Sequence, residues 1–205
     1  MTLEEKKERV VQKEWDFFQE VKNEGGRASC QNDPETFFIM RRSQFAPWPE
    51  DLLDSYEADL TEAQADGRNP LTEKYAWMME STCPERFAKL RPLLPDLSER
   101  ARQLIESAVS LQLAWMAEYR ENYPLLASGN RRLYASEDTP YETSFETYLR
   151  GELKTYSERT LKLYVRFLQS FQERGENLTY HTMFHTVLAY GYTSLEDAER
   201  QLAGK

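Results

Sequence analysis

The sequence contains few of the residues that build disulfide frameworks and metal centres. Its 205 residues include only two cysteines and two histidines. Cys30 and Cys83 fit neither a CxxC motif nor a zinc-ribbon spacing. In a reducing compartment such a pair is not expected to form a structural disulfide.

Long apolar runs and an excess of positive charge are also missing. No run approaches the roughly 20 apolar residues that a membrane-spanning helix needs. Lys and Arg number 26 against 35 Asp and Glu, which gives a net charge of −9 and argues against a nucleic-acid partner. The first residues, MTLEEKKER, lack the apolar segment of a signal peptide. We therefore expect a cytoplasmic protein that binds neither nucleic acid nor membranes.

The pattern of apolar residues is helical almost throughout. Prolines, glycines and capping residues divide it into predicted helices at residues 2–22, 32–44, 50–65, 71–80, a short stretch after 84, 98–119, 141–174, 178–190 and from 194 onward. No segment alternates like a strand, and no repeat of 20 to 50 residues is present. The sequence predicts one all-α domain of eight or nine helices over residues 1–205, with residues 1–13 as a charged N-terminal extension of the first helix.

Two features interrupt this pattern. Residues 126–140 are polar and irregular, and a loop of about 15 residues in a compact domain is often functional. We expect this loop to act as a lid over a ligand. Gly151 lies inside the predicted helix at 141–174, where it is expected to kink or split that helix.

The segment EGGRASCQND at residues 24–33 is unusual in composition. Paired glycines let the backbone approach a ligand closely, Arg27 offers a planar fork for an anion, and Cys30 precedes a helix N-terminus that lowers a thiol pKa. One interpretation is an anion-binding loop with Cys30 as a catalytic nucleophile. The other is a helix terminator, a buried thiol and a helix cap.

Charged residues interrupt several apolar stripes. Glu152 lies three residues after Leu149 and four before Tyr156, so it points inward on a regular helix. Glu14 and Arg41 occupy similar positions. Because a buried charge needs a partner, these residues form either a structural ion-pair network or a polar ligand pocket between helices. In a pocket, Glu152 is the candidate catalytic acid or base, provided that burial raises its pKa.

Aromatic and charged residues also alternate in the segment SFETYLRGEL at residues 144–153. Tyr148, Glu152 and Tyr156 share one helical face, and Arg150 is placed to pair with Glu146 four residues earlier. We therefore predict ligand contacts from Tyr148, Arg150 and Tyr156, together with Arg27 and Arg41. Tyrosines at the edge of an ordinary core are the alternative.

His181 and His185 lie four residues apart on one helical face, a spacing that can hold a metal ion when a carboxylate supplies a third ligand. The zinc-protease motif requires Glu after the first His, where this chain has Thr182. The Glu-x-x-His motif of di-iron bundles is also missing. Ordinary packing or hydrogen bonding is the alternative.

The strings EGGRASCQ from residue 24, FFIMRRSQF from residue 37, SFETYLRGEL from residue 144 and YGY from residue 190 resemble a bacterial domain-of-unknown-function family of about 200 residues. The resemblance covers residues 15–202 and leaves out the charged first dozen. It implies that these polar segments belong to one domain and converge in space. It implies no activity, cofactor or catalytic residue.

Three functional hypotheses follow. The first is a small-molecule-binding protein, for a ligand that is anionic, with a polar pocket between helices; it includes the possibility of an enzyme. The second is an adaptor that binds a partner protein through Trp48, Trp77 or the aromatic residues of 134–148. The third is a metal-dependent enzyme that uses His181 and His185. A homodimer is compatible with each of them, and the sequence names no cofactor.

Overall fold

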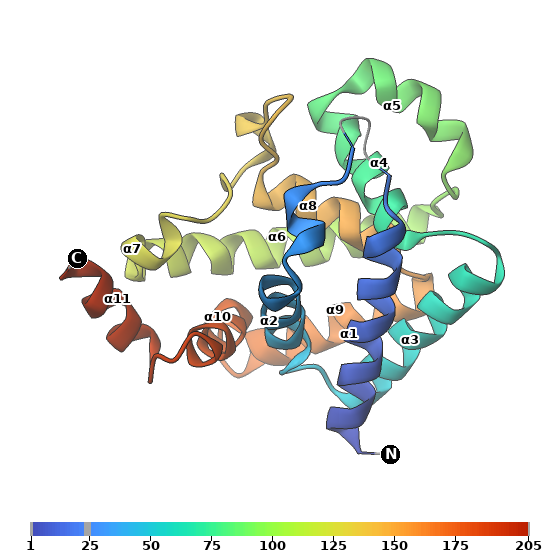
Figure 1. Ribbon diagram of the computed structural model, residues 1–205. Helices are drawn as coiled ribbons and strands as arrows, with labels where there is room; N and C mark the ends of the chain where they lie inside the picture. Colours follow the sequence, from blue (N-terminus) through green and yellow to red (C-terminus); the bar gives the residue numbers. More distant parts are fainter. Residues whose placement is uncertain (1, 23–25, 205) are drawn as a thin grey trace.

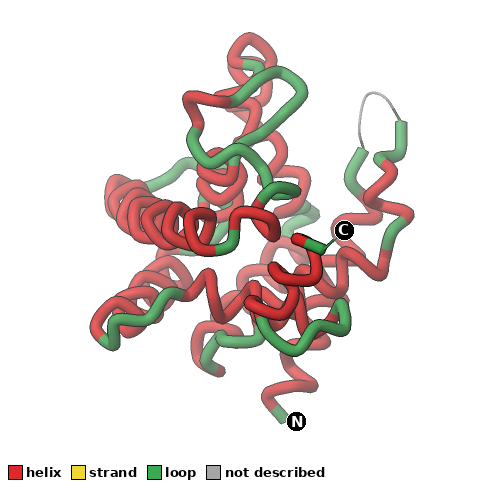
Figure 2. The backbone as a smooth tube through the Cα atoms, turned by 90° about the vertical axis from the view of Figure 1, so that its left-hand side faces the viewer, coloured by secondary structure: helices red, strands yellow, loops and turns green. Residues whose placement is uncertain are grey.

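The computed structural model describes residues 2–22 and 26–204, and these residues form an all-α domain (Figures 1 and 2). The α-helices are α1 (Leu3–Glu20), α2 (Pro34–Phe45), α3 (Glu50–Ala65), α4 (Pro70–Thr82), α5 (Pro84–Leu90), α6 (Glu99–Asn122), α7 (Pro124–Ala127), α8 (Phe145–Leu153), α9 (Glu158–Glu173), α10 (Leu178–Ala189) and α11 (Leu195–Ala203). Three short 3₁₀ helices are η1 (Ser29–Asn32), η2 (Arg91–Leu93) and η3 (Ala135–Glu137). The predicted fold class is confirmed. The described chain has more helices than the eight or nine expected, because residues 141–174 form two helices and α7 is a separate short one.

The helices begin where the sequence supplies a cap. Asp33 precedes α2 and accepts a hydrogen bond from the Thr36 amide at 3.0 Å, and Asn69 caps α4 through the Thr72 amide at the same distance. In both helices proline takes the first position, where no intrahelical amide donor is needed. These short signals fix where α2 and α4 start, and therefore which of their residues face inward.

The main core lies among α1, α2, α3, α6, α8 and α9. Its largest fully buried side chains include Phe45, Trp48 and Leu161. The residues 1–13 do not merely extend α1, because Val10 and Val11 are completely buried in this core. The expectation that Trp48 or Trp77 offers an exposed partner surface is wrong, since their side chains are 2% and 4% exposed.

A second, smaller core lies where α10 and α11 pack against the end of α6 and α7, at one side of Figure 1. Its buried members are Tyr119, Ala127, Val187, Leu195 and Ala198. The carboxylate of Glu199 ties α11 to α7 by accepting hydrogen bonds from the Leu125 and Leu126 amides at 2.7 and 2.8 Å. Within the described chain, no helix combines the length and apolar character needed to cross a bilayer.

Gly151 brings α8 close to α4 and does not split a helix. The break between α8 and α9 falls at residues 154–157. A Cβ atom built on Gly151 would lie 2.9 Å from Cγ of Met78 and 3.0 Å from the backbone oxygen of Lys74. Because backbone atoms cannot retreat as a flexible side chain does, this position accepts only hydrogen.

We predict that Gly151→Ala lowers the free energy of unfolding by about 1 kcal/mol. Overpacking costs about 1–3 kcal/mol, which outweighs the gain of up to about 1 kcal/mol that alanine brings to a helix. Urea denaturation followed by circular dichroism measures the change. Gly129→Ala is the matched control, because a Cβ atom added at Gly129 would have no other atom within 4 Å. A Gly151→Ala variant at least as stable as the wild type would contradict this account of the helix contact.

Candidate functional site

Four charged side chains from four helices meet inside the domain. Glu14 of α1, Arg41 of α2, Lys74 of α4 and Glu152 of α8 are between 1% and 9% exposed. We call these four residues the charge cluster. Two positive and two negative charges give it no net charge, which is what burial in a poorly polarisable interior demands.

Arg41 joins the two carboxylates of the charge cluster. Its Nε donates to Oε2 of Glu14 at 2.6 Å, and its Nη2 donates to the other oxygen of the same carboxylate. Its Nη1 reaches Oε1 of Glu152 at 3.3 Å. The hydroxyl of Tyr56 adds a hydrogen bond to Oε1 of Glu14 at 2.6 Å. The planar guanidinium on α2 thus links a carboxylate of α1 to a carboxylate of α8 through fixed geometry.

Glu152 accepts hydrogen bonds from three further side chains. Lys74 Nζ lies 2.5 Å from Oε2, Gln44 Nε2 lies 2.8 Å from Oε1, and the Tyr156 hydroxyl lies 3.1 Å from Oε1. Arg41, Glu152 and Tyr156 therefore converge as expected. They bind one another and two residues not singled out from the sequence, so this polar interior is filled by its own side chains.

The charge cluster holds Arg41, Lys74 and Glu152 in their charged forms. Burial alone would raise the pKa of Glu152, but Arg41, Lys74 and the hydrogen bonds outweigh it and hold this pKa well below its usual range. Burial would lower the pKa of Arg41 and of Lys74, yet the facing carboxylates raise both. Glu152 therefore carries no proton at neutral pH, which contradicts the expectation of a raised pKa; its role as a catalytic acid or base stays a prediction.

The charge cluster approaches the surface at Tyr148. Lys74 Nζ lies 3.5 Å from the centroid of the Tyr148 ring, and the guanidinium carbon of Arg131 lies 4.7 Å from it. Tyr148 is half-buried and Arg131 is exposed. Arg131 donates to the Thr143 carbonyl at 3.1 Å and has no carboxylate within 4 Å among the described residues. We call Lys74, Tyr75, Arg131 and Tyr148 the cation–tyrosine site.

Cys30 lies near Tyr75 at the edge of this site. Burial and the neighbouring Tyr148, offset by Lys74, raise the pKa of Tyr75 to about 12. Cys30 lies near enough to raise that pKa further. The thiol of Cys30 is free and exposed, which corrects the interpretation of a buried one. We expected the segment with Cys30 to lie near α8. Cys30 lies near Tyr75 of α4, and α4 in turn packs against α8.

The segment that carries Arg131 is anchored at the start of α8. Asp138 accepts hydrogen bonds from the Ser144 amide at 2.6 Å and from the Ser81 and Thr147 hydroxyls at 2.5 Å. Its pKa is lowered because these bonds outweigh the effect of burial. The segment is therefore placed beside the cation–tyrosine site, while its action as a lid stays a prediction.

Arg27 contacts its neighbours in the chain and the end of α1. It donates to Asn32 Oδ1 at 2.7 Å, to the Gln31 carbonyl at 2.8 Å and to Oε1 of Gln19, and its side chain is exposed. Glu24 and Gly25 of the same motif lie outside the described residues. α1 ends at Glu20, before the glycines.

Gln31 caps the end of α1, whereas the sequence attributed this helix end to the glycine pair. Its buried amide donates to the carbonyls of Phe18 and Val21 at 2.8 and 3.0 Å. Sequence reasoning missed this role, because a glutamine that caps the end of a helix from ten residues further along leaves no periodic signal.

Arg150 and the histidines lie outside the charge cluster. Arg150 binds Glu106 at 2.9 Å and Glu146 at 3.0 Å, which confirms the predicted pair with Glu146. His181 Nε2 lies 3.7 Å from Oε2 of Glu176. Burial and the charge of Lys7 lower the pKa of His185. Among residues 2–22 and 26–204, no three His, Cys, Asp or Glu residues are grouped to hold a metal ion, so we base no proposal on the HxxxH pair.

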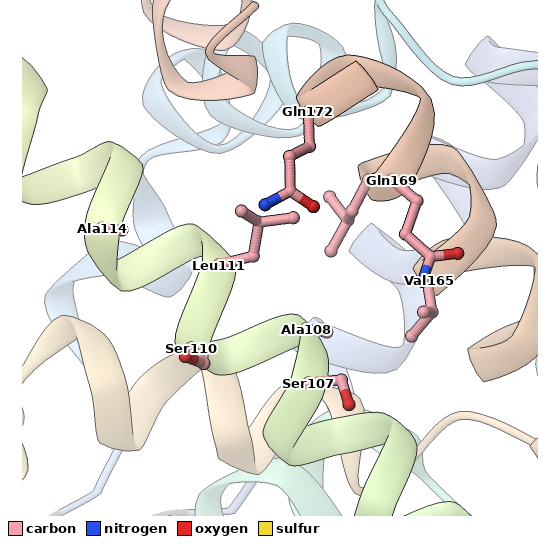
Figure 3. Close-up of a pocket in the computed structure, with 9 residues that line it drawn as sticks. Ser107, Ala108, Ser110, Leu111, Ala114, Val165, Gln169 and Gln172 are labelled. Carbon is pink, nitrogen blue, oxygen red and sulfur yellow. The ribbon is translucent and has the colours of Figure 1, made fainter. Parts of the chain in front are cut away.

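Lys74 could have been found from the sequence. It lies three residues before Trp77 and four before Met78, on the buried stripe of α4. Arg131 could not, because it lies in an irregular segment whose position depends on Asp138. The well-formed grooves also lie elsewhere: one of about 420 Å³ opens between α6 and α9, lined by Ser107, Leu111 and Val165 among others (Figure 3).

The fold and the charge cluster define an all-α domain whose helices are joined by buried ion pairs. The chain belongs to the family described as "Protein of unknown function (DUF4125)", whose pattern matches residues 4–200. The match begins in α1, earlier than residue 15, so the charged first helix is part of the family domain. No curated protein and no solved structure matches the chain significantly.

We predict that Glu152→Gln lowers the free energy of unfolding at neutral pH by about 3–5 kcal/mol, because it leaves Arg41 and Lys74 buried with one carboxylate. A lowered pKa in the folded state means that this stabilisation is complete above the ordinary pKa of 4.5 and is lost as the pH falls. The stability gap between wild type and variant should therefore narrow in acid.

Denaturant titrations at a series of pH values test this. Glu8→Gln is the matched control, since Glu8 pairs with Arg42 on the surface, where an ion pair contributes at most about 1 kcal/mol. A stability gap that stays constant as the pH falls would show that Glu152 does not carry the acid-sensitive stabilisation.

Proposed function

We propose that this protein binds a small anionic ligand, a carboxylate or a phosphate ester, at the cation–tyrosine site. The observation that carries the proposal is the exposed guanidinium of Arg131 over the face of Tyr148, with no carboxylate partner among the described residues. In a chain with a net charge of −9, an arginine without an acidic partner is a selective place for an anion.

The chemistry of the site supports recognition more than catalysis. Arg131 supplies a planar set of N–H donors, of which one is used by the Thr143 carbonyl. Lys74 also packs on the Tyr148 ring, and Glu152 neutralises the charge of Lys74. The charge cluster beneath holds these groups in place without competing for the ligand. We assign no reaction to the site.

Arg131→Ala is expected to weaken anion binding at least tenfold, since a charge-assisted hydrogen bond contributes about 1.5–3 kcal/mol. Inorganic phosphate and a panel of mono- and dicarboxylates serve as probes, with binding followed by NMR titration. Arg132→Ala is the matched control, because Arg132 is the adjacent exposed arginine and lies 3.9 Å from Glu137. Equal binding by both variants would remove Arg131 from the site.

Cys30 provides an independent readout. An anion bound beside Tyr75 is expected to slow the alkylation of Cys30 by iodoacetamide, while Cys83 reacts at an unchanged rate as an internal control. Mass spectrometry of the alkylated peptides measures both rates. Unchanged alkylation of Cys30 at saturating anion would place the ligand elsewhere.

Native mass spectrometry of the freshly purified protein would identify the ligand class. Extra mass that disappears on denaturation would belong to a co-purified molecule. A partner protein is the second candidate, favoured by Tyr134 and Tyr141, which are 47% and 96% exposed in the segment that carries Arg131. An intact complex with a second polypeptide in the same spectrum would support that candidate.

A further inference from the structure

The groove between α6 and α9 is a surface without charge on a highly charged protein. It is lined by Ser107, Ala108, Ser110, Leu111 and Ala114 of α6 and by Val165, Leu168, Gln169 and Gln172 of α9 (Figure 3). A neighbouring groove of about 480 Å³ shares Leu111, Ala114 and Gln172 with it and adds the carboxylates of Glu118 and Glu176, so the two form one trough whose charged residues lie toward the C-terminal ends of the helices. We call this surface the α6–α9 face.

The sequence of α6 is consistent with a covered helix. Residues 107–117 contain no charged side chain, although 30% of all residues are charged. One side of this stretch packs into the core through Val109 and Trp115, while Ser107, Ser110 and Ala114 remain exposed. Eight of these eleven residues are apolar, and a helical stretch that is apolar all round is normally covered. The small exposed side chains also allow another helix to approach closely.

Charges at the two ends of this face have opposite signs. Arg100, Ser107, Leu111, Ala114 and Glu118 follow one another on one face of α6 at spacings of seven, four, three and four. The positive charge therefore lies at the N-terminal end of this stripe and the negative charge at the C-terminal end.

On α9, exposed Arg166 precedes exposed Glu173. Lys162 pairs with Glu158 at 2.6 Å near the start of α9, and Arg174 pairs with Glu176 at 3.0 Å just past its end. Arg166 and Glu173 have no ion-pair partner within 4 Å in the described chain, and neither has Arg100. These three charges are therefore available to a partner.

A second copy of this chain can place an opposite charge against each end of the α6–α9 face. The two helices run in roughly the same direction, because Ser107 of α6 lies toward Val165 of α9 while Leu111 lies toward Gln172 (Figure 3). A two-fold axis that lies in the plane of the face, perpendicular to the two helices, would lay α6 of one copy over α6 of the other, and α9 over α9, in opposite directions. Arg100 of each copy would then lie toward Glu118 of the other copy, and Arg166 toward Glu173 of the other copy.

We infer that the α6–α9 face is a homodimer interface with antiparallel, two-fold symmetric packing. Its centre is uncharged and close-packing, and its rim carries complementary charge, as in other specific interfaces. The charge pattern is what selects a second copy: a face that is positive at one end and negative at the other is complementary to itself after a half turn.

Sedimentation equilibrium of the full chain tests the inference. The wild type is expected to form dimers in a concentration-dependent way. Ala114→Arg places a charge at the centre of the face and should raise the dimer Kd by at least about 30-fold, the loss typical of a central interface residue. Ala65→Arg, at the exposed end of α3, is the matched control and should leave the Kd unchanged.

Charge reversals test the antiparallel arrangement with variants that leave the packing intact. Arg166→Glu alone and Glu173→Arg alone should each weaken the dimer several-fold, and the double variant should recover the wild-type Kd. A wild type that stays monomeric at all concentrations would overturn the inference. So would a dimer unaffected by Ala114→Arg, or losses that add in the double variant. Circular dichroism of each variant verifies that it is folded.

Discussion

The ion pairing of Glu14, Arg41, Lys74 and Glu152 is the constraint on which the rest of the structure depends. An unpaired charge at any of these buried positions would cost several kcal/mol, so each helix must present its member where the others can reach it. This requirement fixes the rotation of α1, α2, α4 and α8 about their axes more strictly than apolar packing does. Apolar side chains tolerate small shifts, whereas hydrogen-bonded charges do not.

The same constraint explains the surface above it. Lys74 is bound to Glu152 on one side and covers the ring of Tyr148 on the other, so the position of that ring follows from the interior. Asp138 then anchors the segment that carries Arg131, whose guanidinium carbon lies 4.7 Å from the centroid of the same ring. The cation–tyrosine site is thus rigid because its support is buried, although Arg131 itself belongs to an irregular segment.

Much of the fold could be predicted from the sequence, because helix caps and apolar spacing act locally. Asp33 and Pro34 mark the start of α2, and the inward position of Glu152 follows from Leu149 and Tyr156. What could not be predicted depends on contacts between distant segments. Gln31 caps the end of α1 although it lies ten residues after Val21. Gly151 leaves room for the backbone of α4 to lie close to α8. A glycine inside a helix can mark either a kink or a close contact with another helix. The sequence around Gly151 fits both, so only the position of the neighbouring helix distinguishes them.

The charge cluster joins parts of the chain that are far apart: Arg41 and Glu152 are separated by 111 residues, and Lys74 and Glu152 by 78. During synthesis α1, α2 and α4 emerge from the ribosome long before α8. Until α8 arrives, Arg41 and Lys74 have only Glu14 to neutralise them, so the early helices cannot close over their own charges. The folding of this chain must therefore be completed late, and the N-terminal two thirds alone should remain a loosely packed intermediate that chaperones can recognise.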